Sequence, residues 1–222
     1  MAESITVPTG VGPTPGLFVT SADTSLAVVV LHEWWGLAGP HSNIARICDD
    51  LGKAGFPALA PDLYGGASAN DPSAARALAT GLKWEEAKPR IEGGIAEARK
   101  RGAGRVALLG FSMGAQRGMK ATMEGAAVEA LVLFYGLGAP IEESKVNVPV
   151  LGHFVVQDEF VPIDEVREVE HRLKTAGKKL AFQYYDAQHS FMNEKLPSHQ
   201  PQSAQVAWER TLKFLGAARK AG

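Results

Sequence analysis

Cysteine is almost absent from this sequence, since Cys48 is the single cysteine among 222 residues. One cysteine cannot form an intrachain disulfide, which fits a reducing compartment. Long apolar runs are missing as well: a stretch such as residues 26–31 is far shorter than the roughly 20 residues that cross a bilayer. The first six residues lack the basic start and the apolar core of a signal peptide. These absences favour a cytoplasmic protein with no membrane contact.

An excess of one charge is also missing. The 23 lysines and arginines nearly balance the 24 aspartates and glutamates, and no block of like charge occurs. We therefore expect a small-molecule partner, and neither a nucleic acid nor an acidic membrane surface. The apolar share of 45% and the length fit a single domain over residues 1–222. Nothing in the sequence defines the oligomeric state.

Apolar runs alternate with amphipathic stretches, and this alternation predicts an α/β fold with a mostly parallel, twisted sheet and helices on both faces. The first two runs, separated by prolines and glycines, are expected to form an antiparallel hairpin at a sheet edge. Asp71 and Pro72 mark the start of one helix, and Cys48 falls on the apolar face of another. The expected strands span residues 4–7, 17–20, 26–31, 56–60, 105–110, 130–135, 149–156 and 179–185, and the expected helices span residues 41–54, 72–80, 84–101, 112–124, 163–176 and 203–219.

The pentapeptide Gly110-Phe111-Ser112-Met113-Gly114 follows an apolar run and precedes an expected helix. Gly-x-Ser-x-Gly between a strand and a helix is the pattern of a nucleophile elbow, in which small neighbours let the helix pass close to the strand. The pattern alone is weak evidence for a nucleophile in a chain with 24 glycines, because an ordinary glycine-rich turn can have the same sequence pattern. A serine nucleophile also needs a base and an orienting acid, so those residues decide between the two interpretations.

Two further residues complete the order serine, acid, histidine that such a hydrolase requires. Asp158 and His189 follow separate expected strands, as Ser112 does, and the carboxyl ends of parallel strands meet at one edge of a sheet. The alternative for Asp158 is a cap on the helix at residues 163–176. Asp164 lies closer to the start of that helix and is the better capping candidate, which leaves Asp158 for the site.

The remaining candidate acid and histidines are less favourably placed. Glu159 is the second choice for the acid. His153 lies inside an expected strand and is interpreted as a core histidine. His41 and His171 fall on expected helices, and His199 lies farther from the end of its strand. Its position after the last expected strand therefore favours His189 as the base.

A tetrahedral intermediate needs hydrogen-bond donors for its oxyanion. The N–H of Met113, which follows the candidate nucleophile, is the first expected donor, and the N–H of Trp34 in the loop after residues 26–31 is the second. The side chains of Trp34 and Trp35 are expected to line an acyl pocket. Packing against the elbow helix is the alternative for one of the two.

Six motifs occur in order between about residues 26 and 215: His32-Glu33-Trp34-Trp35-Gly36-Leu37, Ala60-Pro61-Asp62-Leu63-Tyr64, Gly110-Phe111-Ser112-Met113-Gly114, Gln157-Asp158-Glu159-Phe160-Val161-Pro162, His189-Ser190-Phe191 and Glu209-Arg210-Thr211-Leu212-Lys213-Phe214-Leu215. Together they resemble the dienelactone hydrolase family. The resemblance implies an α/β-hydrolase fold in one domain, without a large cap domain. The connection at residues 136–148 agrees, since it is too short to contain such a cap.

The resemblance also reveals a difference at the nucleophile. The founding members of the family have cysteine where this chain has Ser112, and in them the glutamate matching Glu33 helps to activate the thiol. With serine, the roles left for Glu33 are to orient the oxyanion loop, to pair with a basic residue or to bind substrate.

A second difference concerns the arginines that hold the carboxylate of the family's dienelactone substrates. One would lie just after the catalytic histidine, where this chain has Met192-Asn193. Arg76 lies near the expected place of the other, and Arg117 is a further candidate, with a solvated or structural role as the alternative for each. The candidate residues for substrate binding or activation are Glu33, Trp35, Tyr64 and Arg76.

The sequence thus favours a serine-dependent hydrolase of carboxylic esters or lactones that works through an acyl-enzyme. Ser112 is the expected nucleophile, His189 the general base and then acid, and Asp158 the orienting carboxylate. No metal or organic cofactor is required. One alternative is a true dienelactone hydrolase (carboxymethylenebutenolidase) of aromatic degradation. The other is a hydrolase-fold protein that binds a small molecule without turnover.

Overall fold

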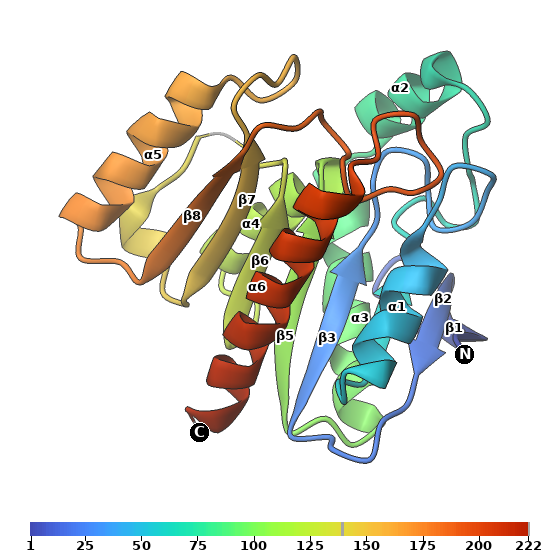
Figure 1. Cartoon of the computed structure of the whole chain (residues 1–222). Helices are drawn as coiled ribbons and strands as arrows, with labels where there is room; N and C mark the ends of the chain where they lie inside the picture. Colours follow the sequence, from blue (N-terminus) through green and yellow to red (C-terminus); the bar gives the residue numbers. More distant parts are fainter. Residues whose placement is uncertain (139, 222) are drawn as a thin grey trace.

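A computed structural model describes residues 1–138 and 140–221, so Ala139 of the connection at 136–148 and Gly222 of the predicted domain lie outside the described residues. At its centre is an eight-stranded sheet with the order β1-β2-β4-β3-β5-β6-β7-β8 (Figure 1). The strands are β1 (Glu3–Val7), β2 (Thr14–Val19), β3 (Leu26–Leu31), β4 (Ala58–Pro61), β5 (Arg105–Phe111), β6 (Ala130–Phe134), β7 (Val150–Val155) and β8 (Leu180–Tyr185). β2 pairs antiparallel with β1 and β4, and the other neighbouring strands pair parallel. The predicted mostly parallel sheet with an antiparallel edge is confirmed.

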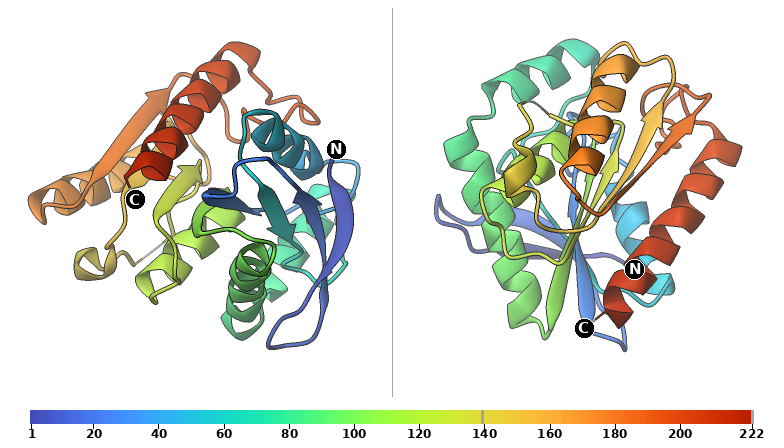
Figure 2. Two further views of the ribbon diagram at one scale, coloured as in Figure 1. Left: turned by 90° about the horizontal axis from the view of Figure 1, so that it is seen from below. Right: turned by 90° about the vertical axis from the view of Figure 1, so that its left-hand side faces the viewer.

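Helices cover both faces of the sheet, as predicted (Figure 2). They are α1 (Ile44–Lys53), α2 (Pro72–Gly81), α3 (Trp84–Lys100), α4 (Met113–Met123), α5 (Ile163–Thr175) and α6 (Pro201–Lys220), with the short 3₁₀ helix η1 (Glu143–Lys145). α1 and α6 pack on one face, and α3, α4 and α5 pack on the other. Val28 and Val30 of β3 pack in the hydrophobic core beneath α1 and α6. Val29 and Leu31 pack in the core beneath α3, α4 and α5, so the strand is buried on both sides.

α2 lies apart from these two layers, near the carboxyl ends of the strands (Figure 1). Its start is the predicted one: the Asp71 side chain accepts a hydrogen bond from the Ala74 N–H at 2.9 Å, and Pro72 is the first residue. Within the described residues, the connection between β6 and β7 contains only η1, so no cap domain covers this edge of the sheet. None of the helices in the described ranges is long and apolar enough to span a membrane.

α3 is continuous, although Pro89 and two glycines lie within it. Both glycines have a packing role. A Cβ on Gly93 would lie 2.5 Å from the carbonyl oxygen of Pro8, and one on Gly94 would lie 2.9 Å from Cγ of Pro61. The glycines therefore let α3 lie close to the residues that follow β1 and to the end of β4.

Two assignments near helix starts were wrong. His41 lies outside any helix, because α1 begins only at Ile44 and the His41 ring packs on Trp35 with ring centroids 4.6 Å apart. Asp164 lies within the first turn of α5 and does not cap it; the N-cap is Pro162, which has no capping side chain.

Two other elements are longer than predicted. β2 begins at Thr14 and includes Pro15, whose carbonyl accepts from the Asp62 N–H. α6 begins at Pro201, a residue well suited to the first position of a helix. Val206 of this helix is 37% exposed, and the buried stripe of α6 is formed by Ala204, Ala207, Thr211 and Leu215.

Candidate active site

Ser112 lies at the turn between β5 and α4 with φ 49° and ψ −114°, a backbone conformation that a non-glycine residue adopts only when its surroundings enforce it. Close packing supplies that constraint. A Cβ on Gly114 would lie 2.3 Å from the carbonyl oxygen of Leu31, and one on Gly110 would lie 2.6 Å from the backbone of Ala115. The two glycines let α4 begin directly against β3 and β5, which leaves the serine at the tip of the turn.

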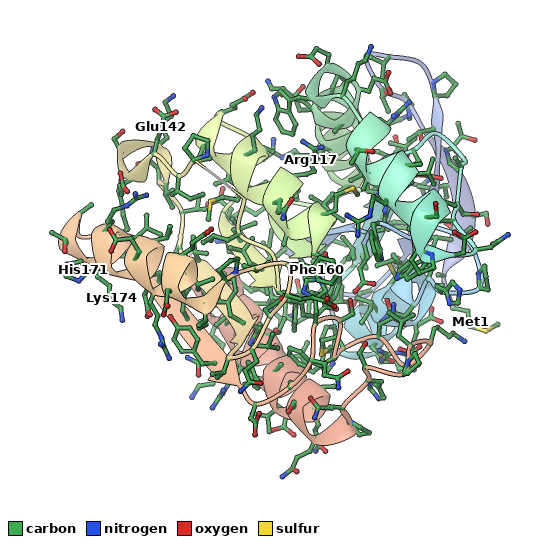
Figure 3. All side chains as sticks on the ribbon, turned by 90° about the horizontal axis from the view of Figure 1, so that it is seen from above. Met1, Arg117, Glu142, Phe160, His171 and Lys174 are labelled. Atoms are coloured by element: carbon green, nitrogen blue, oxygen red, sulfur yellow. The ribbon has the colours of Figure 1, made fainter. Side chains whose placement is uncertain are left out.

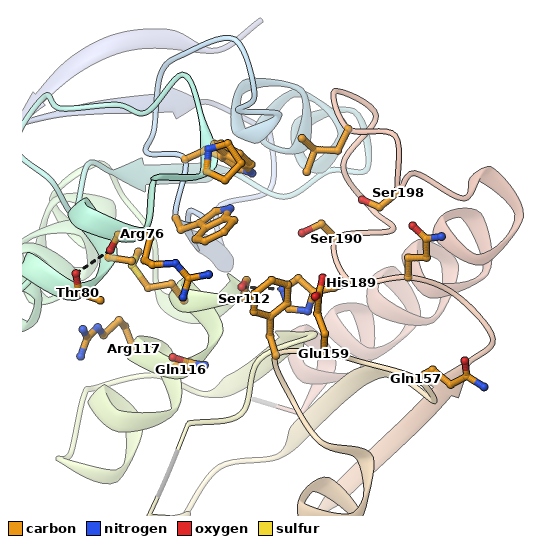
Figure 4. Close-up of a pocket in the computed structure, with 18 residues that line it drawn as sticks. Arg76, Thr80, Ser112, Gln116, Arg117, Gln157, Glu159, His189, Ser190 and Ser198 are labelled. Carbon is orange, nitrogen blue, oxygen red and sulfur yellow. Dashed lines mark hydrogen bonds between the residues drawn. The ribbon is translucent and has the colours of Figure 1, made fainter. Parts of the chain in front are cut away.

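The three residues predicted as nucleophile, base and acid lie within hydrogen-bond distance of one another, and two of them, Ser112 and His189, are side by side in Figure 4. The Ser112 Oγ lies 2.9 Å from Nε2 of His189. The other ring nitrogen, Nδ1, lies 2.8 Å and 3.0 Å from the two carboxylate oxygens of Asp158. This arrangement fits an imidazole that donates from Nδ1–H to the carboxylate and accepts the serine hydroxyl at Nε2.

Asp158 is fixed by its own loop. Its Oδ1 accepts hydrogen bonds from the N–H groups of Phe160 at 2.8 Å and Val161 at 3.2 Å. Its side chain is only 2% exposed, and that of His189 is 12% exposed. Because Pro162 is the N-cap of α5, Asp158 does not have the capping role considered as its alternative. The second-choice acid, Glu159, lines the nearby cavity, and the histidine hydrogen-bonds to the Asp158 carboxylate instead.

A cavity of about 760 Å³ opens at Ser112, at the edge where the parallel strands end. Such a concave, partly apolar space suits a small molecule. No cluster of three or more metal-ligating side chains occurs in the part of the chain that the structure describes. The wall includes Trp34, Trp35, Phe160, Arg76, Arg117, Gln116, Gln188 and Leu196.

Both tryptophans line this cavity, and both pack in a cluster that includes α2. They contact each other edge to face, with ring centroids 5.3 Å apart. Trp35 is buried in a small cluster with Ala75 of α2, and Trp34 packs against the same cluster. The sequence could not predict the packing of the tryptophans against α2, because the two segments are far apart in the sequence and meet only in the folded protein.

Tyr64 connects the two residues whose N–H groups were predicted to hold an oxyanion. Its hydroxyl lies 3.2 Å from the carbonyl oxygen of Trp34 and 3.1 Å from Sδ of Met113. Burial raises the pKa of the Tyr64 hydroxyl above its usual range. Within the described residues, the N–H groups of Trp34 and Met113 donate to no protein acceptor. Tyr64 thus helps to hold the loop after β3 against the start of α4.

Glu33 lies behind His189 and not on the cavity wall. It is 3% exposed, and its Oε1 accepts from the Tyr135 hydroxyl at 2.7 Å while its Oε2 accepts from Asn193 Nδ2 at 3.0 Å. Burial raises the pKa of Glu33, and the hydrogen bonds from Tyr135 and Asn193 oppose that shift. Of the roles considered for Glu33, pairing with a basic residue is not observed among the described side chains.

Tyr135 and Asn193 are the site residues that the sequence did not identify. Tyr135 was assigned to the end of a strand, but it has φ 38° and follows β6. Its ring lies 4.9 Å from the His189 ring, and Asn193 Nδ2 also donates to the His41 carbonyl at 3.0 Å. The only sequence signal was the position of Tyr135 and Gly136 directly after a buried strand. A Cβ on Gly136 would lie 2.2 Å from the carbonyl oxygen of Ser112.

Comparison with known proteins places this chain among hydrolases. Residues 15–219 match the dienelactone hydrolase family. The chain belongs to this family. It is 34% identical over 199 residues to Protein usf of Aquifex pyrophilus. This match covers 84% of this chain and 86% of Protein usf. It is 31% identical over 182 residues to carboxymethylenebutenolidase of Pseudomonas sp. strain P51, with 74% of each chain covered.

A solved structure shows the same fold. The dienelactone hydrolase-like promiscuous phosphotriesterase P91 from metagenomic libraries superposes with a TM-score of 0.79 at 20% identity, over 98% of both chains. The predicted family and α/β-hydrolase fold are therefore confirmed, and the protein is a hydrolytic enzyme of the dienelactone hydrolase family.

The lone cysteine of this dienelactone hydrolase family member does not reach the site. Cys48 is buried on the inner face of α1, as predicted for a core residue. Burial raises the pKa of its thiol far above the ordinary value, which disfavours the reactive thiolate. Ser112 is thus the side chain that hydrogen-bonds the histidine at the elbow.

Two arginines line the cavity on the side of α2 and α4. Arg76 is an exposed residue of α2, and Arg117 of α4 is half-buried, with Nη2 donating to the Leu82 carbonyl at 3.1 Å. Burial lowers the pKa of the Arg117 guanidinium. Neither forms a salt bridge among the described side chains. Met192 and Asn193, which replace the other expected arginine, are buried and do not line the cavity, and Asn193 donates to Glu33 instead.

Proposed function

We propose that this enzyme is a serine-dependent hydrolase of carboxylic esters or lactones that works through an acyl-enzyme. The observation that carries the proposal is the chain of hydrogen bonds from Ser112 Oγ to His189 Nε2 at 2.9 Å and from His189 Nδ1 to Asp158 at 2.8 Å. A serine, a histidine and a carboxylate in this geometry form the arrangement that activates a hydroxyl for acyl transfer. The adjoining cavity supplies space for the ester.

The proposed reaction begins when Ser112 Oγ attacks the carbonyl carbon and its proton moves to Nε2 of His189. Asp158 stabilises the resulting imidazolium, and the N–H groups of Met113 and Trp34 donate to the oxyanion. The bond to the leaving oxygen then breaks, and Nε2 returns the proton to that oxygen. Water attacks the acyl-enzyme by the same route, with its proton passing to Nε2 and then to Ser112 Oγ.

A second candidate is the hydrolysis of dienelactones that carry a carboxylate. Arg76 and Arg117 favour it, because two guanidinium groups line the catalytic cavity without a salt-bridge partner among the described residues. A cis-dienelactone assayed beside a neutral lactone separates the two candidates. A kcat/KM for the dienelactone that is higher by about tenfold or more, and that falls in Arg76→Ala and Arg117→Ala, would favour the second.

The experiment that tests the proposal is a panel of esters and lactones assayed with the wild-type enzyme and Ser112→Ala. We expect the variant to lose about four to six orders of magnitude in turnover, because the members of such a group act as a unit. A fluorophosphonate probe should add its mass to the wild-type chain and not to Ser112→Ala. Folded wild-type protein that neither reacts with the probe nor turns over any ester would favour binding without catalysis.

A further inference from the structure

A second hollow adjoins the catalytic cavity. It has a volume of about 400 Å³ and lies between α4 and α5. Two side chains, Gln116 of α4 and Phe160 of the loop after β7, line both spaces. Seen from above the ends of the strands, Phe160 lies near the middle of this face of the molecule (Figure 3). These two side chains therefore form the boundary between the hollow and the catalytic cavity.

Phe160 links this boundary directly to the reacting groups. Its ring centroid lies 4.8 Å from that of His189 and 5.8 Å from that of Trp34. The side chain is also 46% exposed, an unusual state for a phenylalanine that contacts a catalytic base. A substrate group that extends from the ester bond at Ser112 past this ring enters the second hollow.

The lining of the second hollow indicates what kind of group it takes. Its inner wall consists of the apolar side chains of Leu137, Ile141, Val161, Val166 and Val169. Among the described residues of the lining, the only basic side chain is that of Arg172, which forms a 2.6 Å salt bridge with Glu143 and donates to the Ile141 carbonyl. Glu165 and Glu168 lie on the same lining and disfavour an anionic tail. The hollow thus suits a neutral hydrocarbon group.

We propose that this hollow is a subsite for the neutral alkyl chain of the substrate ester, entered between Gln116 and Phe160. The inference rests on the proposed ester hydrolysis and adds a preference for a chain that extends beyond the catalytic cavity. Continuity with the cavity at Ser112 identifies the occupant as part of the substrate. Its small volume fits a chain, not a folded partner.

The test compares kcat/KM for ethyl acetate, octyl acetate and ethyl octanoate. We expect the wild type to favour at least one octyl substrate over ethyl acetate by about tenfold or more, since each added methylene gains contact in an apolar pocket. The two octyl substrates show whether the chain belongs to the alcohol or to the acyl group.

Two pairs of variants locate the effect. Val169 lines only the second hollow, so Val169→Phe fills it and Val169→Ala enlarges it without touching the catalytic cavity. Val169→Phe should reduce the long-chain preference about tenfold, and Val169→Ala should keep or increase it. At the exposed boundary position, Gln116→Trp should reduce the preference in the same way, and Gln116→Ala should not.

The ratio of the long-chain to the short-chain kcat/KM is the deciding quantity. If both Val169→Phe and Gln116→Trp hydrolyse esters with the wild-type ratio, the subsite is overturned while the proposed function stands. If the wild type cleaves no ester and takes up no fluorophosphonate, the proposed function fails instead. Thermal unfolding shows whether Val169→Phe folds; if it does not, the exposed Gln116 pair decides.

Discussion

Glu33 is a buried carboxyl group whose two oxygens are each held by a side-chain donor from a distant part of the chain. Tyr135 supplies one hydroxyl, and it also places its ring 4.9 Å from the ring of His189. Tyr135 has a left-handed backbone conformation, which persists only when its surroundings hold it. We therefore infer that Glu33 positions the base through Tyr135, although it contacts no reacting atom.

We expect Glu33→Gln and Tyr135→Phe each to lower kcat for ester hydrolysis about tenfold with little change in KM. The single oxygen of the amide in Glu33→Gln can accept from only one of the Tyr135 and Asn193 donors, and in Tyr135→Phe a carboxylate oxygen loses its donor, so a buried polar group is left unpaired. Steady-state kinetics of both variants and of the double variant provide the measurement. The double variant should lose little more than either single one, because both act on the same contact.

Glu92→Gln is the matched control, since it removes a carboxyl group that is half exposed on α3. Wild-type kcat in Glu33→Gln would show that the buried carboxyl group does not act on the base.

At the scale of elements, the site depends on how closely α4 approaches the sheet. Glycine is required at 114 because a Cβ there would lie 2.3 Å from the Leu31 carbonyl oxygen and 2.6 Å from that of His32. His32 itself is buried and joins two strand ends: Nδ1 lies 2.7 Å from the Glu33 carbonyl oxygen, and Nε2 accepts from the Leu63 N–H at 2.9 Å. With Nε2 accepting, the imidazole is neutral, so its 3.5 Å approach to Asp62 is not an ion pair.

We expect Gly114→Ala to lower the free energy of unfolding by about 2 kcal/mol or more, because backbone atoms must move to admit the Cβ. Gly216→Ala is the matched comparison. Gly216 lies in α6, and a Cβ there would meet no atom within 4 Å, so alanine should stabilise the helix by about 0.5–1 kcal/mol. Urea unfolding of the two variants measures both changes. Equal effects in the two variants would contradict the role given to close packing at the elbow.

At the scale of the whole molecule, a buried histidine joins the last helix to the sheet. His153 of β7 lies 2.8 Å from the Tyr185 hydroxyl through Nδ1 and 3.0 Å from Thr211 Oγ1 of α6 through Nε2. The Thr211 hydroxyl donates to the Ala207 carbonyl, so it accepts from the imidazole. Burial, with the nearby Arg210, lowers the pKa of His153 from 6.5 to about 3. The predicted role of a core histidine is confirmed.

This shift makes the stability of the protein depend on pH. Between about pH 6.5 and pH 3, the unfolded state binds a proton that folded His153 does not, so the free energy of unfolding falls as the pH falls. This one group contributes at most about 1.4 kcal/mol per pH unit. Glu33 acts in the opposite direction: its raised pKa gives stability that is present below its ordinary value of 4.5 and is lost as the pH rises above it.

We expect His153→Gln to remove part of the acid dependence, because glutamine retains hydrogen-bonding groups but does not titrate. Urea unfolding at about pH 4 to 7 measures the slope for the variant and the wild type, within the range set by the linkage. His171→Gln, on the exposed side of α5, is the control and should keep the wild-type slope. An unchanged slope in His153→Gln would contradict the assignment.

The order of elements and the three central site residues were predictable for a definite reason. Ser112, Asp158 and His189 each follow a strand, and in a parallel sheet the ends of such strands meet at one edge. The helix start at Asp71 and the core position of Cys48 were equally local, since each depends on neighbouring residues alone.

The contacts that could not be predicted join residues far apart in the sequence. Tyr135 lies 102 residues from Glu33, and Asn193 lies 160 residues from it, so no periodicity connects them. The same holds for Trp35 against α2 and for the hollow between α4 and α5.

The sequence by itself determined the fold, the family and the trio of serine, histidine and aspartate, because apolar periodicity and strand-end positions are local properties of the chain. Only the tertiary structure decided what surrounds that trio: the partners of Glu33, the place of the tryptophans and the second hollow beside Phe160. These depend on which side chains meet when separate strands and helices pack, and that geometry is specified by the whole chain.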